Sequence, residues 1–283
     1  MIASASRVAG SETRRCKRFR FACRKRARRS TVAVLGSRPR RSSRRREPDA
    51  RFSCVLSVSS LSVSLLAVAM PKLQIIVGST RPTRAAERVF PWVVEHAQRH
   101  GAFDVELLDL RDWQLPFFQE HMGTIGDFAD PTYSDPIVKA WNKKIADGDV
   151  YLIVTAEYNH SVPGQLKNAI DNVFVSFALR NKPVGFVGYS GGIAAGTRAV
   201  EHLALIMIEA EAVPLRNSVL IPFVANAFGE DGEPADPAAG IALSITLDDL
   251  AWWSNVLSRA RTEGELLPGT FRARAAAAAS QAD

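Results

Sequence analysis

Five short apolar runs alternate with amphipathic stretches along most of this chain, and this alternation constrains the fold more than any other feature. The runs are rich in Val, Ile and Leu and lie at 73–77, 105–110, 150–155, 184–189 and 218–221. Mainly apolar runs of this length indicate strands that are buried on both faces of a sheet. The other stretches repeat apolar residues at helical spacing, at 85–100, 137–147, 165–175, 197–211 and 243–261. The pattern predicts an α/β fold with a doubly wound, five-stranded parallel sheet and helices on both faces.

The charge of the chain changes sign near Met70. Residues 1–69 contain 18 Lys and Arg against three Asp and Glu, whereas residues 70–283 contain 18 against 26. The formal net charge of +7 is therefore the sum of a leader of about +15 and a remainder of about −8. Basic runs without apolar periodicity predict that the leader is disordered. A nucleic-acid or anionic-membrane partner, which a basic balance suggests, is thus a question for the leader alone.

Three interpretations of the leader stay open. An organelle transit peptide is rich in Arg and Ser and poor in acids, as this segment is. A nucleic-acid-binding arm is the least favoured, because such arms usually carry more aromatic residues than Phe19, Phe21 and Phe52. The third interpretation is that translation starts at Met70, directly before the first predicted strand. The uncharged run at 53–69 is rich in Ser and follows a long basic segment, so we predict no membrane anchor there.

The cysteines divide in the same way as the charge. Cys16, Cys23 and Cys54 all lie before Met70, so the rest of the chain has no disulfide, thiolate–zinc site or catalytic thiol. This composition favours a cytoplasmic location, or an organelle if the leader is a transit peptide. The expected divisions are a leader, an α/β domain and a disordered Ala-rich tail, at 1–69, 70–267 and 268–283.

The loop after the first predicted strand is the clearest candidate for a ligand site, because doubly wound sheets bind ligands beyond the carboxyl ends of their strands. It reads Gly-Ser-Thr-Arg-Pro-Thr-Arg over 78–84 and leads into a helix. Its hydroxyl groups, the Arg81 cation and the free amides of the helix N-terminus suit a phosphate. The loop matches neither the Walker nor the dinucleotide glycine pattern, so a monophosphate is the better prediction. The alternative is an ordinary turn in which Arg81 and Arg84 are solvated.

The loop after the third predicted strand, at 157–164, suits a flat heterocycle. Tyr158 offers a face beside which a ring can lie, and Asn159 offers polar groups to the ring's edge. The alternative is a capped turn with an exposed Tyr. His160 is more readily a solvated residue than a metal ligand, because no second His or Cys pairs with it in sequence, and we predict no metal site. Glu157 could act as a base by type, but a single loop Glu is usually a hydrogen-bonding group.

The loop after the fourth predicted strand contains Ser190, Gly191 and Gly192. Paired glycines let a ligand approach the backbone closely. Considered alone, the loop is more simply interpreted as a flexible turn. One loop thus suits a phosphate and two others suit a flat ring, which together predict that the ligand is a mononucleotide with a large heterocycle.

These three loops resemble those of the NADPH-dependent FMN reductases, flavodoxin-like flavoproteins that include quinone, azo and chromate reductases. The resemblance covers about 70–267 and depends on 78–84, on 190–192, and most of all on 157–164 together with 166–171. Ala156 stands where the family often has Pro, and Thr83 where relatives often have Gly. Neither departure removes a predicted donor, but both weaken assignment to a single subfamily.

The resemblance implies a flavodoxin-like fold, non-covalent FMN, NADPH or NADH as co-substrate, and a homodimer or homotetramer. No side chain is expected to be catalytic, because the chemistry takes place on the FMN. It implies phosphate contacts from the first loop and ring contacts from the other two. The expected cofactor-binding residues are Ser79, Arg81, Arg84, Ala85, Ala86, Glu87, Glu157, Tyr158, Asn159, His160, Ser190, Gly191 and Gly192.

The implied activity is hydride transfer from NAD(P)H through FMN to a quinone, an azo compound, free flavin or a similar small acceptor such as a metal oxyanion. A flavodoxin-like electron carrier without enzymatic activity is the first alternative, and the acidic balance of residues 70–283 allows it. A nucleic-acid-binding protein that acts through its basic leader is the second and weaker alternative.

Overall fold

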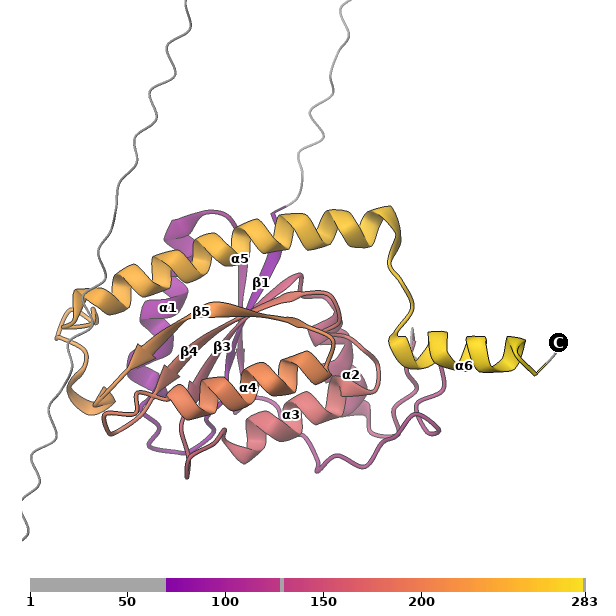
Figure 1. Ribbon diagram of the computed structural model, residues 1–283. Coiled ribbons are helices and arrows are strands. Elements are labelled where there is room, and N and C mark those ends of the chain that lie inside the picture. The colour runs from indigo at the N-terminus through magenta and orange to yellow at the C-terminus, as the bar shows by residue number, and fades with distance from the viewer. Residues whose placement is uncertain (1–69, 128–129, 282–283) are drawn as a thin grey trace, which may run out of the picture. The chain divides into compact units, whose positions relative to one another are not determined.

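The computed structural model describes residues 70–127 and 130–281 (Figure 1). The predictions of a disordered leader and of no membrane anchor at 53–69 lie outside these residues. No helix in the described ranges has both the length and the apolar character needed to cross a bilayer.

The central feature is one sheet of five parallel strands. Their order across the sheet is β2-β1-β3-β4-β5. This is the order of flavodoxin-like doubly wound sheets, in which the chain switches direction between β1 and β3. The predicted fold class is therefore confirmed. The strands are β1 (Lys72–Val77), β2 (Asp104–Asp109), β3 (Val150–Ala156), β4 (Pro183–Tyr189) and β5 (Val213–Ile221).

Helices cover both faces of the sheet (Figure 1). On one face, α1 (Ala86–His100) and α5 (Pro237–Gly264) pack against the strands. On the other face lie α2 (Pro136–Ala146), α3 (Gly164–Phe174) and α4 (Thr197–Glu209). Because both faces are covered, every residue of β3 and β4 is buried, which explains why these strands appear as continuous apolar runs.

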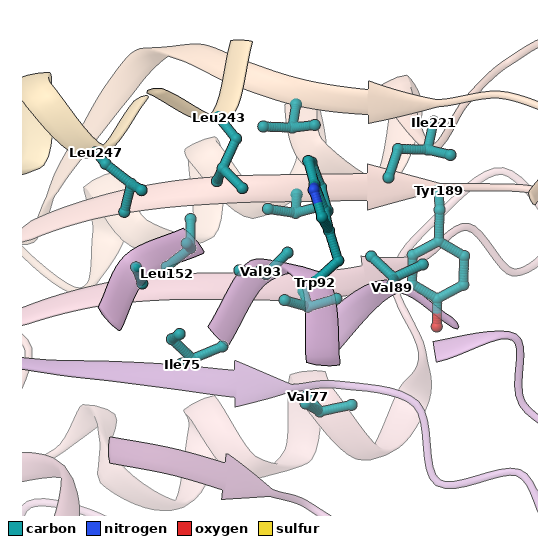
Figure 2. Packing of buried hydrophobic residues seen from close by; sticks show 14 of the residues in the cluster. Ile75, Val77, Val89, Trp92, Val93, Leu152, Tyr189, Ile221, Leu243 and Leu247 are labelled. Atoms are coloured by element: carbon teal, nitrogen blue, oxygen red, sulfur yellow. The ribbon is translucent and has the colours of Figure 1, made fainter. Parts of the chain in front are cut away.

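Figure 2 shows how the first face is filled. Val93 of α1 and Leu152 of the sheet belong to one buried layer, and the Trp92 ring extends upward from α1 toward the α5 side of that layer. Leu247 of α5 joins the layer from above. Apolar residues on α1 face the core at helical spacing and a left-handed Gly101 ends the helix. Because β1 and α1 are both held by this packing, the loop that joins them has a fixed place at the end of β1.

Two elements begin earlier than predicted. The fifth strand was expected at 218–221 but starts at Val213, because Pro214 and Arg216 are tolerated on a strand that lies at the edge of the sheet. The last long helix was expected from residue 243 but starts at Pro237. The Asp236 side chain accepts a hydrogen bond from the Ala238 amide at 2.9 Å and caps it.

The predicted disorder of the tail is wrong for most of its length. Helix α6 spans Gly269–Ala279, where the sequence is mainly Ala. Alanine has the highest intrinsic helix propensity, so the composition that suggested disorder also favours a helix. Phe271 of α6 packs edge-on against Phe177, with 6.0 Å between ring centroids. A short 3₁₀ turn, η1 (Val224–Asn226), follows β5.

Candidate functional site

The structure brings the three predicted loops together at the carboxyl edge of the sheet. They follow β1, β3 and β4, which are neighbouring strands. The hydroxyl groups of Ser79 and Tyr158 are hydrogen bonded at 2.6 Å, and the Arg81 guanidinium lies 5.5 Å from the centre of the Tyr158 ring. The Glu157 amide donates to the Tyr189 carbonyl at 3.0 Å. First, second and third loop refer below to 78–85, 157–163 and 190–196.

The first loop offers a set of hydrogen-bond donors directed beyond the end of β1. Ser79 is fully buried, and no side chain caps the helix that follows it. The N–H groups of the first helical turn, near Ala85, Ala86 and Glu87, have no partner within the helix. Gly78 lets the strand pack closely on α3, because a Cβ would lie 2.7 Å from a methyl of the Leu166 side chain and would force that side chain to shift. Free amides beside a buried hydroxyl are the arrangement that binds phosphate at helix N-termini.

Arg84 supports this loop from inside the protein. Its guanidinium forms a bidentate pair with the Asp109 carboxylate, donates to the Ser79 carbonyl at 2.7 Å, and donates from Nε to Glu87 at 3.0 Å. Burial alone would raise the pKa of Asp109, but the bonds from Arg84 and from the Arg111 amide hold that pKa below its ordinary value. Arg84 was predicted to touch the cofactor, whereas this geometry directs it to the loop itself.

Arg81 is the exposed cation of the loop, and a second arginine holds its backbone. The Arg111 guanidinium donates to the carbonyls of Arg81 and Pro82, the latter at 3.0 Å, and pairs with Glu87 at 2.6 Å. The Arg81 side chain itself stays accessible. Sequence reasoning missed Arg111, whose only signal was its position directly after the second strand.

The second loop is a tight hairpin. The backbones of Tyr158 and Ser161 exchange hydrogen bonds of 2.8 and 3.1 Å around two residues with positive φ, Asn159 at 49° and His160 at 72°. These angles define a type I′ turn. The turn exposes Asn159 and His160 at its tip, and the His160 ring lies 6.4 Å from that of His202.

Glu157 fastens the second loop to α4. Its carboxylate is paired with the Arg198 guanidinium and accepts a bond from the Arg198 amide at 3.3 Å. The Glu157 side chain is only 3% exposed. A carboxylate held in this way is a positioning group and not a free base. The sequence did not predict this role of Arg198, because Arg198 lies far along the chain from Glu157.

The third loop is held by a hydrogen bond within it and by one from Phe223, while its two glycines leave the backbone open. The Ser190 hydroxyl donates to the Gly192 carbonyl at 2.9 Å, and that carbonyl also accepts from the Phe223 amide at 3.3 Å. A Cβ at Gly191 or Gly192 would meet no atom within 4 Å, so the backbone is accessible. Phe223 was not predicted; its φ of 46° is strained for an aromatic residue, and half of its surface is exposed beside the loop.

A cleft of about 280 Å³ opens next to the first loop. It lies between that loop, the segment after β2 and the start of α3. The sequence did not reveal it, because its walls come from three separate segments. Its lining residues are Thr80, Leu110, Arg111, Trp113, Gln114, Leu115, Gln165 and Asn168.

The residues at this edge fit FMN. The first loop provides amides, the Ser79 hydroxyl and the Arg81 cation for a phosphate, Tyr158 provides a flat face, and the third loop provides open backbone. In the described ranges, no three His, Cys, Asp or Glu side chains are grouped so that they could hold a metal ion.

Comparison with known proteins also points to FMN, because the similar proteins are FMN reductases. An NAD(P)H-dependent FMN reductase of Schizosaccharomyces pombe is 36% identical over 121 residues, which cover 43% of this chain and 58% of that protein. Another, from a Nectria species, is 30% identical over 160 residues, covering 55% and 77%. The match thus spans less than two thirds of the S. pombe protein's length.

Solved structures show the same fold. The Paracoccus denitrificans flavoenzyme FerB, an NAD(P)H:(acceptor) oxidoreductase, superposes with a TM-score of 0.54 at 22% identity, over 65% of this chain and 97% of FerB. The model of one protein family, the NADPH-dependent FMN reductases, matches residues 71–226, which is more than half of the chain. This chain therefore belongs to the NADPH-dependent FMN reductase family.

Proposed function

We propose that this chain is an FMN-dependent oxidoreductase, which takes hydride from NADPH or NADH and passes reducing equivalents to a small acceptor. The acceptor class is a quinone, an azo compound, free flavin or a similar molecule. The observation that carries the proposal is the contact between the first and second loops, where Ser79 and Tyr158 share a 2.6 Å hydrogen bond. It joins a phosphate-binding loop to an aromatic face at the edge where this sheet binds ligands.

The side chains divide into two groups by what they would do. Ser79, Arg81 and the first amides of α1 would hold the phosphate, and Tyr158 with the third loop would border the ring. Arg84 and Glu157 would keep these loops in place, because protein groups already occupy both side chains. Bound FMN supplies the hydride chemistry, and the protein's part is to orient it and leave it open to both substrates.

The test uses purified full-length protein. We expect flavin absorption bands, either as isolated or after addition of FMN, and we expect NADPH or NADH to bleach them. Reoxidation by a quinone, an azo dye or free flavin would then identify the acceptor class. Protein that stays colourless, does not bind FMN and shows no FMN-dependent NAD(P)H oxidation contradicts the proposal. Protein that binds FMN but does not oxidise NAD(P)H favours the electron carrier.

The proposal includes self-association in the cytoplasm. The outer face of α5 supports the first part, because it exposes several large apolar side chains, which soluble monomers seldom group together. The absence of cysteine from residues 70–283 supports the second, since it is typical of a reduced compartment. The apolar residues on α5 are Ile241, Ile245, Trp252, Trp253 and Val256.

A further inference from the structure

Tyr189 is a buried tyrosine whose hydroxyl group has no partner among the described residues. It is the last residue of β4, its side chain is 2% exposed, and its Oη accepts and donates no hydrogen bond. Figure 2 shows the hydroxyl pointing away from the apolar layer, past Val89 and toward the end of β1. Buried polar groups almost always have partners, so an exception at a ligand-binding edge calls for an explanation.

The neighbours of this hydroxyl are the groups that build the phosphate end of the site. Tyr158, Ser79, Arg84 and Glu87 are the polar side chains that act on it. Ser79 lies near enough to act as a hydrogen-bonding group, although no bond of good geometry joins the two hydroxyls. Burial raises the pKa of Tyr189 far above its ordinary value. At neutral pH the phenol therefore keeps its proton and acts as a neutral hydrogen-bond donor or acceptor.

Ser79 connects these groups, and its capacity is limited. A serine hydroxyl has one proton and two lone pairs. In the structure, its Oγ is engaged with the Tyr158 hydroxyl at 2.6 Å. When Ser79 directs its proton to a phosphate oxygen, both lone pairs become available for donors from behind, and the Tyr158 and Tyr189 hydroxyls are the two donors in place.

We propose that Tyr189 is a positioning residue for the phosphate end of FMN: its hydroxyl donates to Ser79 Oγ when Ser79 donates to the phosphate. The inference rests on the proposed function, since it assumes that FMN binds here. It also explains the unpartnered hydroxyl, because the protein without ligand carries a polar group that becomes fully hydrogen bonded only with the phosphate present.

The test compares Tyr189→Phe with Tyr151→Phe, which removes the same atom elsewhere in the sheet. Tyr151 is fully buried on β3, and its hydroxyl donates to the Ile145 carbonyl at 2.6 Å and the Gly148 carbonyl at 3.2 Å. In urea unfolding without FMN, Tyr151→Phe should lower the midpoint, because it removes two buried hydrogen bonds. Tyr189→Phe should leave the midpoint unchanged or raise it. A fall for Tyr189→Phe as large as that for Tyr151→Phe would overturn the inference.

Binding measurements locate the effect at the phosphate. FMN and riboflavin share the ring and the sugar chain, and only FMN carries the phosphate. Tyr189→Phe should weaken FMN binding about three- to tenfold, the effect of one lost hydrogen bond, and leave riboflavin binding unchanged. An equal loss for both flavins, or no loss for FMN, would overturn the inference.

A double-mutant cycle with Ser79→Ala completes the test, and it needs only FMN titrations. Because Tyr189 acts through Ser79, Tyr189→Phe should have no further effect on FMN binding in the Ser79→Ala background. A full effect in that background contradicts the proposed route. Wild-type protein that binds no FMN would overturn the proposed function itself, whereas wild-type binding with an unaltered Tyr189→Phe variant overturns only the role of Tyr189.

Discussion

Two arginines in the first loop illustrate how far residue type alone determines a role. Arg81 and Arg84 lie three positions apart before the same helix, and both are chemically suited to phosphate. In the structure, Arg81 is exposed above the Tyr158 ring, whereas Arg84 is 6% exposed and bound to Asp109. The partner that decides between them, Asp109, lies on another strand, so no local pattern distinguishes the two side chains.

Substitution of these arginines should therefore change different quantities. Arg81→Ala should weaken FMN binding about tenfold, the effect of a lost charged hydrogen bond at an exposed site, with the unfolding free energy nearly unchanged. Arg84→Ala should lower the unfolding free energy by about 3 kcal/mol, because it leaves a partly buried carboxylate without its counter-ion. Flavin fluorescence titration and urea unfolding measure the two effects. If both variants lose only affinity, the assignment of Arg84 to the loop is wrong.

Lys182, which lies away from the three site loops, should make the free energy of unfolding depend on pH. Its Nζ donates to the Ala146 carbonyl at 2.8 Å and to Tyr151 Oη at 3.2 Å, and burial lowers the pKa of Lys182 to about 8. Between that pH and the ordinary lysine value, the unfolded chain binds a proton that the folded chain does not. Stability should therefore rise with pH in this window, by about 1 kcal/mol per unit from Lys182. Urea unfolding at pH 8, 8.7 and 9.4 measures the slope.

The control for this slope is Lys182→Met, which keeps much of the side-chain volume and removes the titrating group. The variant should be less stable overall through lost hydrogen bonds, and its stability should rise less with pH than that of the wild type. Parallel curves for the two proteins would assign the slope to other groups.

At the scale of elements, β1, β3 and β4 followed directly from the sequence because they are central and covered on both faces, and β2 followed from a short apolar run although it lies at an edge. The fifth strand was only half predicted, since an edge strand alternates buried and exposed residues and tolerates Pro214. The start of α5 was not predicted, because Pro237 and Gly240 are typical of loops. The Asp236 cap is the feature that makes Pro237 the first residue of a helix. The three site loops could be predicted because each follows a strand. Their anchors, Arg111, Arg198 and Phe223, could not be, because they come from elsewhere in the chain.

The junction between β4 and α4 depends on one glycine. Gly196 has a φ of +84°, and a Cβ there would lie 2.4 Å from the Tyr189 amide nitrogen. Gly196→Ala should lower the unfolding free energy by more than about 2 kcal/mol, through backbone strain and the clash. Gly191→Ala is the matched control in the same loop, because its Cβ would meet open space; it should change stability by less than about 0.5 kcal/mol. Thermal and urea unfolding compare the two, and equal losses would contradict this role for Gly196.

At the scale of the whole molecule, the two edges of the sheet are built differently. The carboxyl edge carries open loops and donors without protein partners, whereas ion pairs and hydrogen bonds join separate segments at the amino edge. Lys182 bridges Ala146 and Tyr151 there, and Arg180 binds both Glu211 and Glu265. Glu265 directly follows α5, so this contact also holds the connection to α6. Side chains and backbone that stabilise the fold thus lie at both edges, since Arg84 and Gly196 support the carboxyl edge, whereas the candidate ligand-binding loops lie at the carboxyl edge.

Self-association is the prediction that belongs to this scale. Trp252 is 59% exposed in the apolar face of α5, and Leu205 of α4 is similarly exposed at 66%. If α5 forms the contact between copies, Trp252→Glu should reduce the molar mass in solution to that of one chain, because it buries a charge in an apolar interface. Leu205→Glu should leave the mass unchanged. Light scattering after size-exclusion chromatography measures both, and dissociation by Leu205→Glu alone would place the interface on α4.

The cleft beside the first loop has an optical consequence. Trp113 lines it, and its ring lies 4.9 Å from that of Trp141, so two of the five tryptophans of the chain form a close pair near the site. Flavins absorb where tryptophan emits, and energy passes efficiently between chromophores within one small domain. The protein thus contains its own reporter of occupancy: its ultraviolet-excited emission should dim as the cofactor arrives and recover as it leaves, without any added label.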